Sequence, residues 1–175
     1  RGIRSILMET QILYLERGYE WLWENQFHGS NRTSIRKSKK IGLTITEDLP
    51  NASKVYSDLY RATFVHRKGS KGLIYPKELF HQLAQFKRNV KFYFSLLNDQ
   101  PIAGIIVLYG NKEVSYWSGV TLPEYKPLNA TQLLLDYAIQ KAIEQKMTTF
   151  DFGARRGLPN VKKFKSLFGP EDVGY

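Results

Sequence analysis

Two stretches of the sequence concentrate cationic side chains without acidic neighbours. Residues 32–40 contain five Lys or Arg residues and no Asp or Glu, and residues 155–165 do the same. Such clusters are suited to binding phosphates in nucleic acids, nucleotide-linked precursors or lipid-linked precursors. Runs of charge also occur on ordinary solvated surfaces. The sequence therefore leaves two interpretations open, a phosphate-binding surface and a plain charged surface.

The first stretch lies in a predicted helix over residues 30–40. Arg32, Arg36, Lys39 and Lys40 recur at the helical period, so they share one face of that helix. We select Arg32, Arg36 and Lys40 as candidate phosphate-binding residues, with a solvated helix face as the alternative.

The second stretch follows a predicted strand at residues 148–152. Asp151 alternates with two phenylalanines, so its side chain faces away from theirs. Arg155 and Lys165 are among the cations that follow, and Lys165 comes directly after an expected core phenylalanine. We select Asp151 and Lys165 as catalytic candidates, and Arg155 and Lys165 as phosphate-binding candidates. An aspartate that merely pairs with an arginine, and a lysine that covers apolar surface, remain the alternatives.

The composition restricts the class of protein. The chain has 175 residues, of which 42% are apolar, enough for one domain with a substantial core. A net charge of +10 favours an anionic partner. There is no cysteine and the three histidines are widely spaced, so we expect no disulfide, no thiol nucleophile and no metal site. No apolar run approaches the ~20 residues of a membrane helix. We expect a cytoplasmic protein that can work at a membrane surface.

The predicted elements indicate a mixed sheet. Strands at 91–97, 102–109 and 113–119 are separated by short turns, which predicts an antiparallel meander. A strongly apolar helix at 128–146 then separates the strand at 113–119 from the one at 148–152, which predicts one parallel pair. We therefore predict an α+β fold with a mostly antiparallel mixed sheet flanked by helices.

This element order is similar to the GNAT acyltransferase core. Four segments resemble the FemABX-like and BioF2-like branch, which includes the peptidoglycan-bridge aminoacyltransferases. They are "NRTSIRKSKKIGLTI", "NDQPIAGIIVLYGNKEVSYWSGV", "NATQLLLDYAIQKA" and "FDFGARRGLPNVKKFKSLFG", and together they span roughly residues 30–170. The resemblance implies that residues 29–175 form a GNAT-like domain, the second in a longer chain. Residues 1–28 would then connect it to a preceding GNAT-like domain.

The resemblance also implies a function. It predicts an acyltransferase that moves an acetyl or aminoacyl group onto an amine of a phosphate-bearing small-molecule or lipid-linked acceptor, such as a cell-envelope precursor in cell-wall biogenesis. The donor would be aminoacyl-tRNA or acyl-CoA, without a metal, and the amine would attack the ester or thioester carbonyl directly.

Three residues take their expected roles from this resemblance. In GNAT folds the strand matching 113–119 diverges from its parallel neighbour and its backbone N–H groups hold the reacting carbonyl, which makes Tyr116 a catalytic candidate, with packing as the alternative. The lysine matching Lys165 faces substrate phosphate in the Fem-like pattern. Asn129, near the start of the long helix, is also typical of that pattern.

Two features depart from ordinary GNAT enzymes. The segment "EYKPLNAT" lacks the glycines of the usual pyrophosphate loop, and the last core helix has no tyrosine to protonate a leaving thiolate. We therefore expect weak or absent binding of acetyl-CoA. We also expect Arg36, Lys40 and Lys165 to converge on one cleft beside the start of the helix at 129–146. A non-catalytic nucleic-acid-binding module, for tRNA, is the alternative function.

Overall fold

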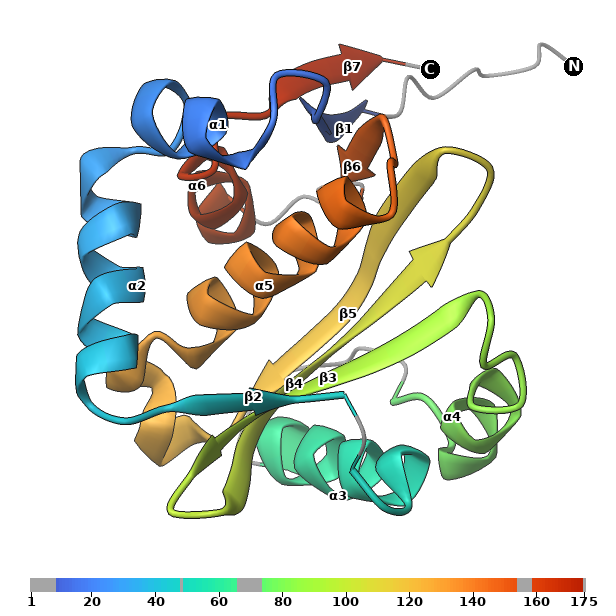
Figure 1. Ribbon diagram of the computed structural model, residues 1–175. Coiled ribbons are helices and arrows are strands. Elements are labelled where there is room, and N and C mark those ends of the chain that lie inside the picture. Colours follow the sequence, from blue (N-terminus) through green and yellow to red (C-terminus); the bar gives the residue numbers. More distant parts are fainter. Residues whose placement is uncertain (1–8, 48, 66–73, 154–158, 175) are drawn as a thin grey trace, which may run out of the picture.

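Seven strands form a single sheet in the order β2-β3-β4-β5-β6-β1-β7 in the computed structural model of the protein (Figure 1). The structure describes residues 9–47, 49–65, 74–153 and 159–174. The elements are β1 (Glu9–Tyr14), α1 (Tyr19–Asn25), α2 (Gly29–Lys40), β2 (Thr44–Thr46), α3 (Ala52–Val65), α4 (Lys77–Leu83), β3 (Val90–Leu97), β4 (Gln100–Tyr109), β5 (Glu113–Thr121), the 3-10 helix η1 (Pro123–Leu128), α5 (Ala130–Glu144), β6 (Thr149–Asp151), α6 (Pro159–Ser166) and β7 (Glu171–Gly174).

The central meander is confirmed. β3, β4 and β5 are consecutive antiparallel neighbours, and β5 pairs in parallel with β6. The turn between β3 and β4 uses Asn98 and Asp99, both with positive φ, which matches the twist of the flanking strands. The other pairings are antiparallel, so the predicted α+β class with a mostly antiparallel mixed sheet is confirmed.

Helices cover both faces of the sheet and enclose two apolar cores. α1, α2, α5 and α6 lie on one face, and α3 and α4 lie on the other (Figure 1). The alternation of side chains along the strands explains this division. Phe150 and Val114 face α5, whereas Phe92 and Ile106 face α3 and α4.

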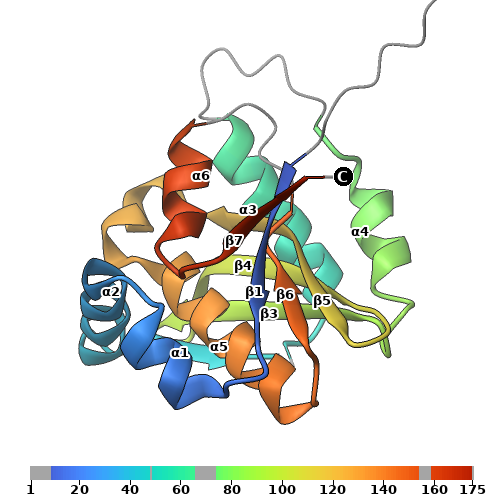
Figure 2. The same cartoon turned by 90° about the horizontal axis from the view of Figure 1, so that it is seen from above.

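Residues near the N-terminus take part in the sheet. β1 lies between β6 and β7, with Ile12 opposite Asp151 and Thr10 opposite Val173 (Figure 2). Leu22 of α1 is fully buried in the same core as α5. The segment 9–27, which we assign from the sequence to a connection, is therefore continuous with the domain. The existence of a preceding domain stays a prediction.

Candidate active site

β5 and β6 separate soon after they begin to pair. β5 is nine residues long, but only Glu113 to Ser115 pair with the three residues of β6. From Tyr116 onward, within the described part of the chain, β5 has no strand on its β6 side. The backbone N–H groups on that side are therefore available to a ligand, whereas the Thr121 carbonyl accepts from the Thr63 hydroxyl at 3.2 Å.

A β-bulge lies where this separation begins. Ile106 of β4 is opposite Ser118 and Val107 is opposite Tyr116, which leaves Trp117 without a partner on β4. Tyr116 consequently packs on the α5 side of the sheet and Trp117 on the α3 side, as their alternation predicts.

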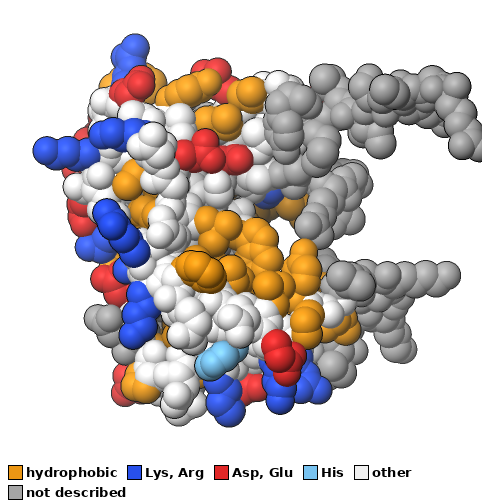
Figure 3. All heavy atoms as spheres, turned by 90° about the vertical axis from the view of Figure 1, so that its right-hand side faces the viewer, with side chains coloured by type: hydrophobic (Ala, Val, Ile, Leu, Met, Phe, Trp, Pro, Cys, Tyr) orange, Lys and Arg blue, Asp and Glu red, His pale blue; other side chains and the backbone are white. Residues whose placement is uncertain are grey.

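The Trp117 side of the sheet is aromatic and apolar. Trp117 lies 5.4 Å from Tyr75 and 6.4 Å from Phe80, measured between ring centroids. Two exposed apolar residues, Ile74 and Phe86, flank α4 in the sequence. Apolar side chains gather at the centre of the face that includes α4, with charged ones around them (Figure 3). This side therefore offers apolar contacts to a ligand.

A cleft of about 430 Å³ opens beside the second half of β5, where elements from both faces of the sheet meet. It lies between β5, the start of α5, the end of α3, and α6. Its lining residues are Thr63, Phe64, Gly119, Val120, Thr121, Pro123, Lys126, Asn129, Ala130, Thr131, Gln132 and Phe164.

The start of α5 gives one end of the cleft an anion-binding character. Asn129 adopts a left-handed conformation (φ 56°) and no side chain caps the helix. The first N–H groups of a helix have no acceptor within it, and they carry the positive end of the helix dipole. Lys126, an exposed cation, lines the cleft beside them. This end can hold a phosphate although it lacks the usual glycines.

Tyr116 places its hydroxyl against Gly119, which lines the cleft. A side chain at Gly119 would overlap the Tyr116 hydroxyl and would lie 3.0 Å from its Cζ atom. The ring therefore leans along the strand into the space that glycine leaves open. The hydroxyl makes no hydrogen bond among the described residues, and burial raises the pKa of Tyr116. The hydroxyl therefore stays protonated at neutral pH, beside a residue that lines the cleft.

Asp151 and Lys165 meet at the end of β6. Lys165 is 5% exposed, and its Nζ donates to the Gly153 carbonyl at 2.8 Å. Asp151 accepts from the Gly153 N–H at 2.7 Å and from the Thr10 hydroxyl. Burial lowers the pKa of Lys165, and the charge of Asp151 opposes that shift. A Cβ atom at Gly153 would lie 3.4 Å from the Tyr116 carbonyl oxygen. Asp151, Gly153 and Lys165 therefore meet where β6 separates from β5.

The cations of α2 occupy different surroundings. Arg32 donates to the carbonyls of Trp23 and Glu24, at 2.7 and 2.8 Å, and Arg36 lies over the Trp23 ring at 5.3 Å. Lys40 is exposed.

The expected convergence on the cleft is not what the structure shows. Neither Arg36 nor Lys40 lines the cleft, and the Lys165 ammonium contacts a backbone carbonyl. The reason is that the helix face carrying Arg32 and Arg36 packs on the end of α1. Arg155 lies outside the described residues. Phosphate binding by these cations stays a prediction.

Sequence reasoning missed several residues of the cleft. Lys126, Thr131 and Gly119 line it but were not selected from the sequence. The signal for Lys126 was available, since this cation stands three residues before Asn129 at the start of a long helix. Gly119 had no sequence signal, because its importance comes from the orientation of the Tyr116 ring.

Residues 28–166 match the family described as acetyltransferase (GNAT) domain. The chain belongs to the GNAT family. The predicted GNAT-like fold is therefore confirmed, and the divergence of β5 from β6 is the part of this GNAT domain that forms the cleft. No curated protein sequence matches the chain significantly.

The chain spans about three fifths of the length of two solved structures that it resembles, FemX and L-PGS. It resembles FemX with a TM-score of 0.81 and 14% identity, covering 94% of this chain and 59% of FemX. It resembles L-PGS from Bacillus licheniformis with a TM-score of 0.65 and 18% identity, over 96% of this chain and 59% of L-PGS. The ribosomal-protein-S18-alanine N-acetyltransferase from Escherichia coli is similar over 71% of this chain and 76% of its own, with a TM-score of 0.60 and 13% identity. At these identities the likeness concerns the fold alone.

Two further properties concern the described residues. They include no helix long and apolar enough to cross a membrane. They also contain no group of three His, Cys, Asp or Glu side chains that could hold a metal ion.

Proposed function

We propose that this GNAT domain transfers an acetyl or aminoacyl group onto the amine of a phosphate-bearing acceptor. The observation that carries the proposal is the separation of β5 from β6 beside the uncapped start of α5. The gap provides backbone donors for a carbonyl, and the helix start provides donors for a phosphate. Membership of an acetyltransferase family supports the same reaction class.

The residues divide the reaction between them. The start of α5 and Lys126 bind the phosphate of the donor, and free N–H groups of β5 hold its carbonyl. The acceptor amine attacks that carbonyl, so a C–N bond forms while the C–S or C–O bond to the leaving group breaks. The Tyr116 hydroxyl gives its proton to the leaving atom and recovers one from the amine, which balances the step.

Asp151 and Lys165 act on the acceptor side of the reaction in this proposal. Asp151 orients the amine, and Lys165 faces a substrate phosphate. Their shared contact with Gly153 keeps both at the point where β6 leaves β5. Because both groups are largely held by backbone contacts, their positions are set before the substrate arrives.

The donor is an aminoacyl-tRNA or an acyl-CoA. Asn129 and the prolines of η1 stand where ordinary enzymes have a glycine loop, so the backbone approaches a pyrophosphate less closely. We therefore propose that acetyl-CoA binds weakly and that an aminoacyl ester is the better donor. The acceptor we propose is a cell-envelope precursor, reached from the cytoplasm at the membrane surface.

The decisive test supplies each donor in turn to the full natural chain. Acetyl-CoA and aminoacyl-tRNA are offered with amine-bearing, phosphate-bearing acceptors, and acylated product is measured by mass spectrometry. Product that depends on donor and falls in Tyr116→Phe supports the proposal. Salt-sensitive tRNA binding without product from any donor would instead identify a nucleic-acid-binding module. Micromolar acetyl-CoA binding by calorimetry would favour an ordinary acetyltransferase.

A further inference from the structure

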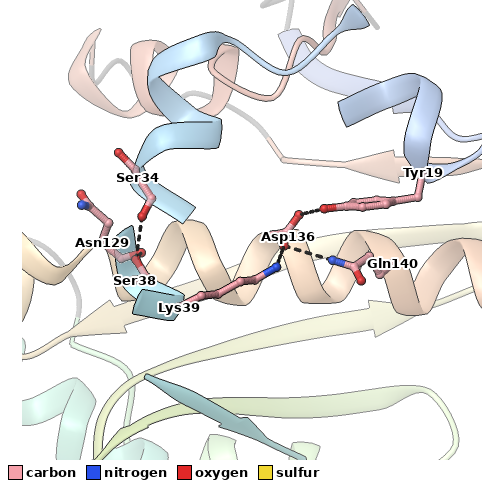
Figure 4. A network of polar contacts seen from close by, with 7 residues as sticks. All are labelled: Tyr19, Ser34, Ser38, Lys39, Asn129, Asp136 and Gln140. Carbon is pink, nitrogen blue, oxygen red and sulfur yellow. Dashed lines mark hydrogen bonds and ion pairs between the residues drawn. The ribbon is translucent and has the colours of Figure 1, made fainter. Parts of the chain in front are cut away.

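Ser38 joins α2 to the turn that precedes α5. Its side chain is fully buried, and its Oγ lies 2.7 Å from the Leu128 carbonyl oxygen. The same Oγ lies 3.4 Å from the carbonyl oxygen of Asn129 (Figure 4). The same Oγ lies 2.9 Å from the carbonyl oxygen of Ser34, one turn earlier on α2. The residue that contacts the start of α5 thus comes from a helix outside the cleft.

The hydroxyl has one hydrogen to share among these acceptors. The Ser34 carbonyl lies within α2, where the helical bond from the Ser38 N–H also reaches it. Within the described ranges, the Leu128 carbonyl has no donor other than Ser38. The Leu128 carbonyl oxygen is the nearest of the three acceptors and gains its donor from Ser38, so the hydroxyl stabilises the structure most when it donates to Leu128. Ser38 therefore completes the hydrogen bonding of the turn.

The turn needs such support because of its backbone conformation. Asn129 is left-handed, which costs most L-residues about 1–2 kcal/mol, although asparagine tolerates it better than most. This residue sets the direction in which the first N–H groups of α5 point. Those groups belong to Ala130, Thr131 and Gln132, all of which line the cleft. A shift of the Leu128 carbonyl would therefore reorient the donors at the anion-binding end.

The next residue of α2 fixes the two helices further along. Lys39 lies 3.3 Å from Asp136, which is 1% exposed on α5. Asp136 also accepts from the Tyr19 hydroxyl at 2.6 Å and from Gln140 at 3.0 Å (Figure 4). The Lys39–Asp136 ion pair joins α2 to α5 independently of Ser38, and Ile35 of α2 is buried in the same core as α5. Removing the Ser38 hydroxyl would thus release the turn without releasing the helix.

We propose that Ser38 is a positioning residue for the acyl donor. Its hydroxyl holds the Leu128–Asn129 turn so that the first N–H groups of α5 stay aimed into the cleft. The inference rests on the proposed function, since it takes the donor phosphate to bind at those groups. In this proposal the Leu128–Asn129 turn, supported by α2, takes the place of the glycine-rich loop of ordinary GNAT enzymes.

The test compares Ser38→Ala with Ser34→Ala in the full natural chain. The Ser34 hydroxyl makes no hydrogen bond within the described residues, so Ser34→Ala is a matched control on the same helix. Ser38→Cys keeps the side-chain volume with a weaker donor. Two quantities are measured: KM and kcat with the donor that gives product, and, without any ligand, amide hydrogen exchange at Leu133, whose N–H donates to the Asn129 carbonyl at 3.3 Å.

We expect Ser38→Ala to raise the donor KM about fivefold, the effect of one hydrogen bond, with little change in kcat. Exchange at Leu133 should become faster in Ser38→Ala because its acceptor is the Asn129 carbonyl of the turn. Ser38→Cys should be intermediate, and Ser34→Ala should match the wild type. Unchanged exchange in Ser38→Ala overturns the inference. Faster exchange with an unchanged KM also overturns it, because the turn would not be the donor site. If the wild type uses no donor, the proposed function fails, while exchange still decides whether Ser38 holds the turn.

Discussion

The substitution Gly119→Ala should displace the Tyr116 hydroxyl while leaving the tyrosine itself unchanged. Gly119 has no positive φ, so alanine meets no backbone strain there. The added Cβ would overlap the Tyr116 hydroxyl and lie 3.0 Å from Cζ and 3.2 Å from Cε2. Because the β5 backbone is paired with β4, the ring is the part that must move. The hydroxyl then leaves its place beside Gly119.

The size of the effect follows from the role of the hydroxyl. A proton donor in the transition state contributes about 10²-fold or more to kcat, so we expect Tyr116→Phe and Gly119→Ala each to lower kcat by about 10²-fold. If Gly119→Ala acts only by displacing the hydroxyl, the double variant should be no slower than Tyr116→Phe. Independent effects would instead multiply to about 10⁴-fold. Overpacking should cost Gly119→Ala about 1–3 kcal/mol of stability.

The assay is the donor-dependent rate of all four proteins, with a thermal melt for each. Gly110→Ala serves as the control, because its Cβ would lie 3.7 Å from the nearest atom, the Glu113 carbonyl oxygen, an ordinary contact. A wild-type kcat in Gly119→Ala would refute the reasoning. So would multiplicative losses in the double variant, since they would separate the glycine from the tyrosine.

Two further predictions concern the cations. Since burial lowers the pKa of Lys165, its ammonium should lose its proton at a lower pH than that of an ordinary lysine. Affinity for pyrophosphate, measured by calorimetry, should therefore weaken as the pH rises through that range in the wild type, but not in Lys165→Arg. A wild-type affinity that does not change with pH contradicts this prediction. Arg32→Ala should lose about 1–2 kcal/mol in urea unfolding, because Arg32 donates to the carbonyls of Trp23 and Glu24, while Lys40→Ala should lose nothing. A lower salt slope of phosphate binding in Arg32→Ala, with unchanged stability, would point to the phosphate role instead.

The central sheet could be predicted because its signals are local. Strands β3, β4 and β5 are joined by short turns, and an Asn-Asp pair at 98–99 suits a tight hairpin. The apolar helix between β5 and β6 then required a parallel pair. The place of β1 could not be predicted, because Ile12 pairs with residue 151, and nothing in the sequence near residue 12 specifies so distant a partner.

The candidate site was only partly predictable. The alternation of side chains along a strand is a local rule, and it accounts for Tyr116 and Trp117 lying on opposite faces. Helical spacing correctly grouped Arg32 and Arg36, yet it could not tell that their face packs on α1. Periodicity shows which residues share a face, whereas the neighbour of that face depends on tertiary packing. The role of Gly119 depends on the orientation of the Tyr116 ring, and the order of residues in the sequence does not predict that orientation.

The position of β1 between β6 and β7 also governs the order in which the chain can fold. On the ribosome the first of these strands emerges long before its two partners, so it stays unpaired while the β3-β4-β5 meander, whose contacts are local, can already form. An unpaired strand is prone to mispairing and aggregation during that interval. Synthesis of residues 149–174 is therefore the step that closes the sheet, and pauses in translation before that point would prolong the vulnerable state.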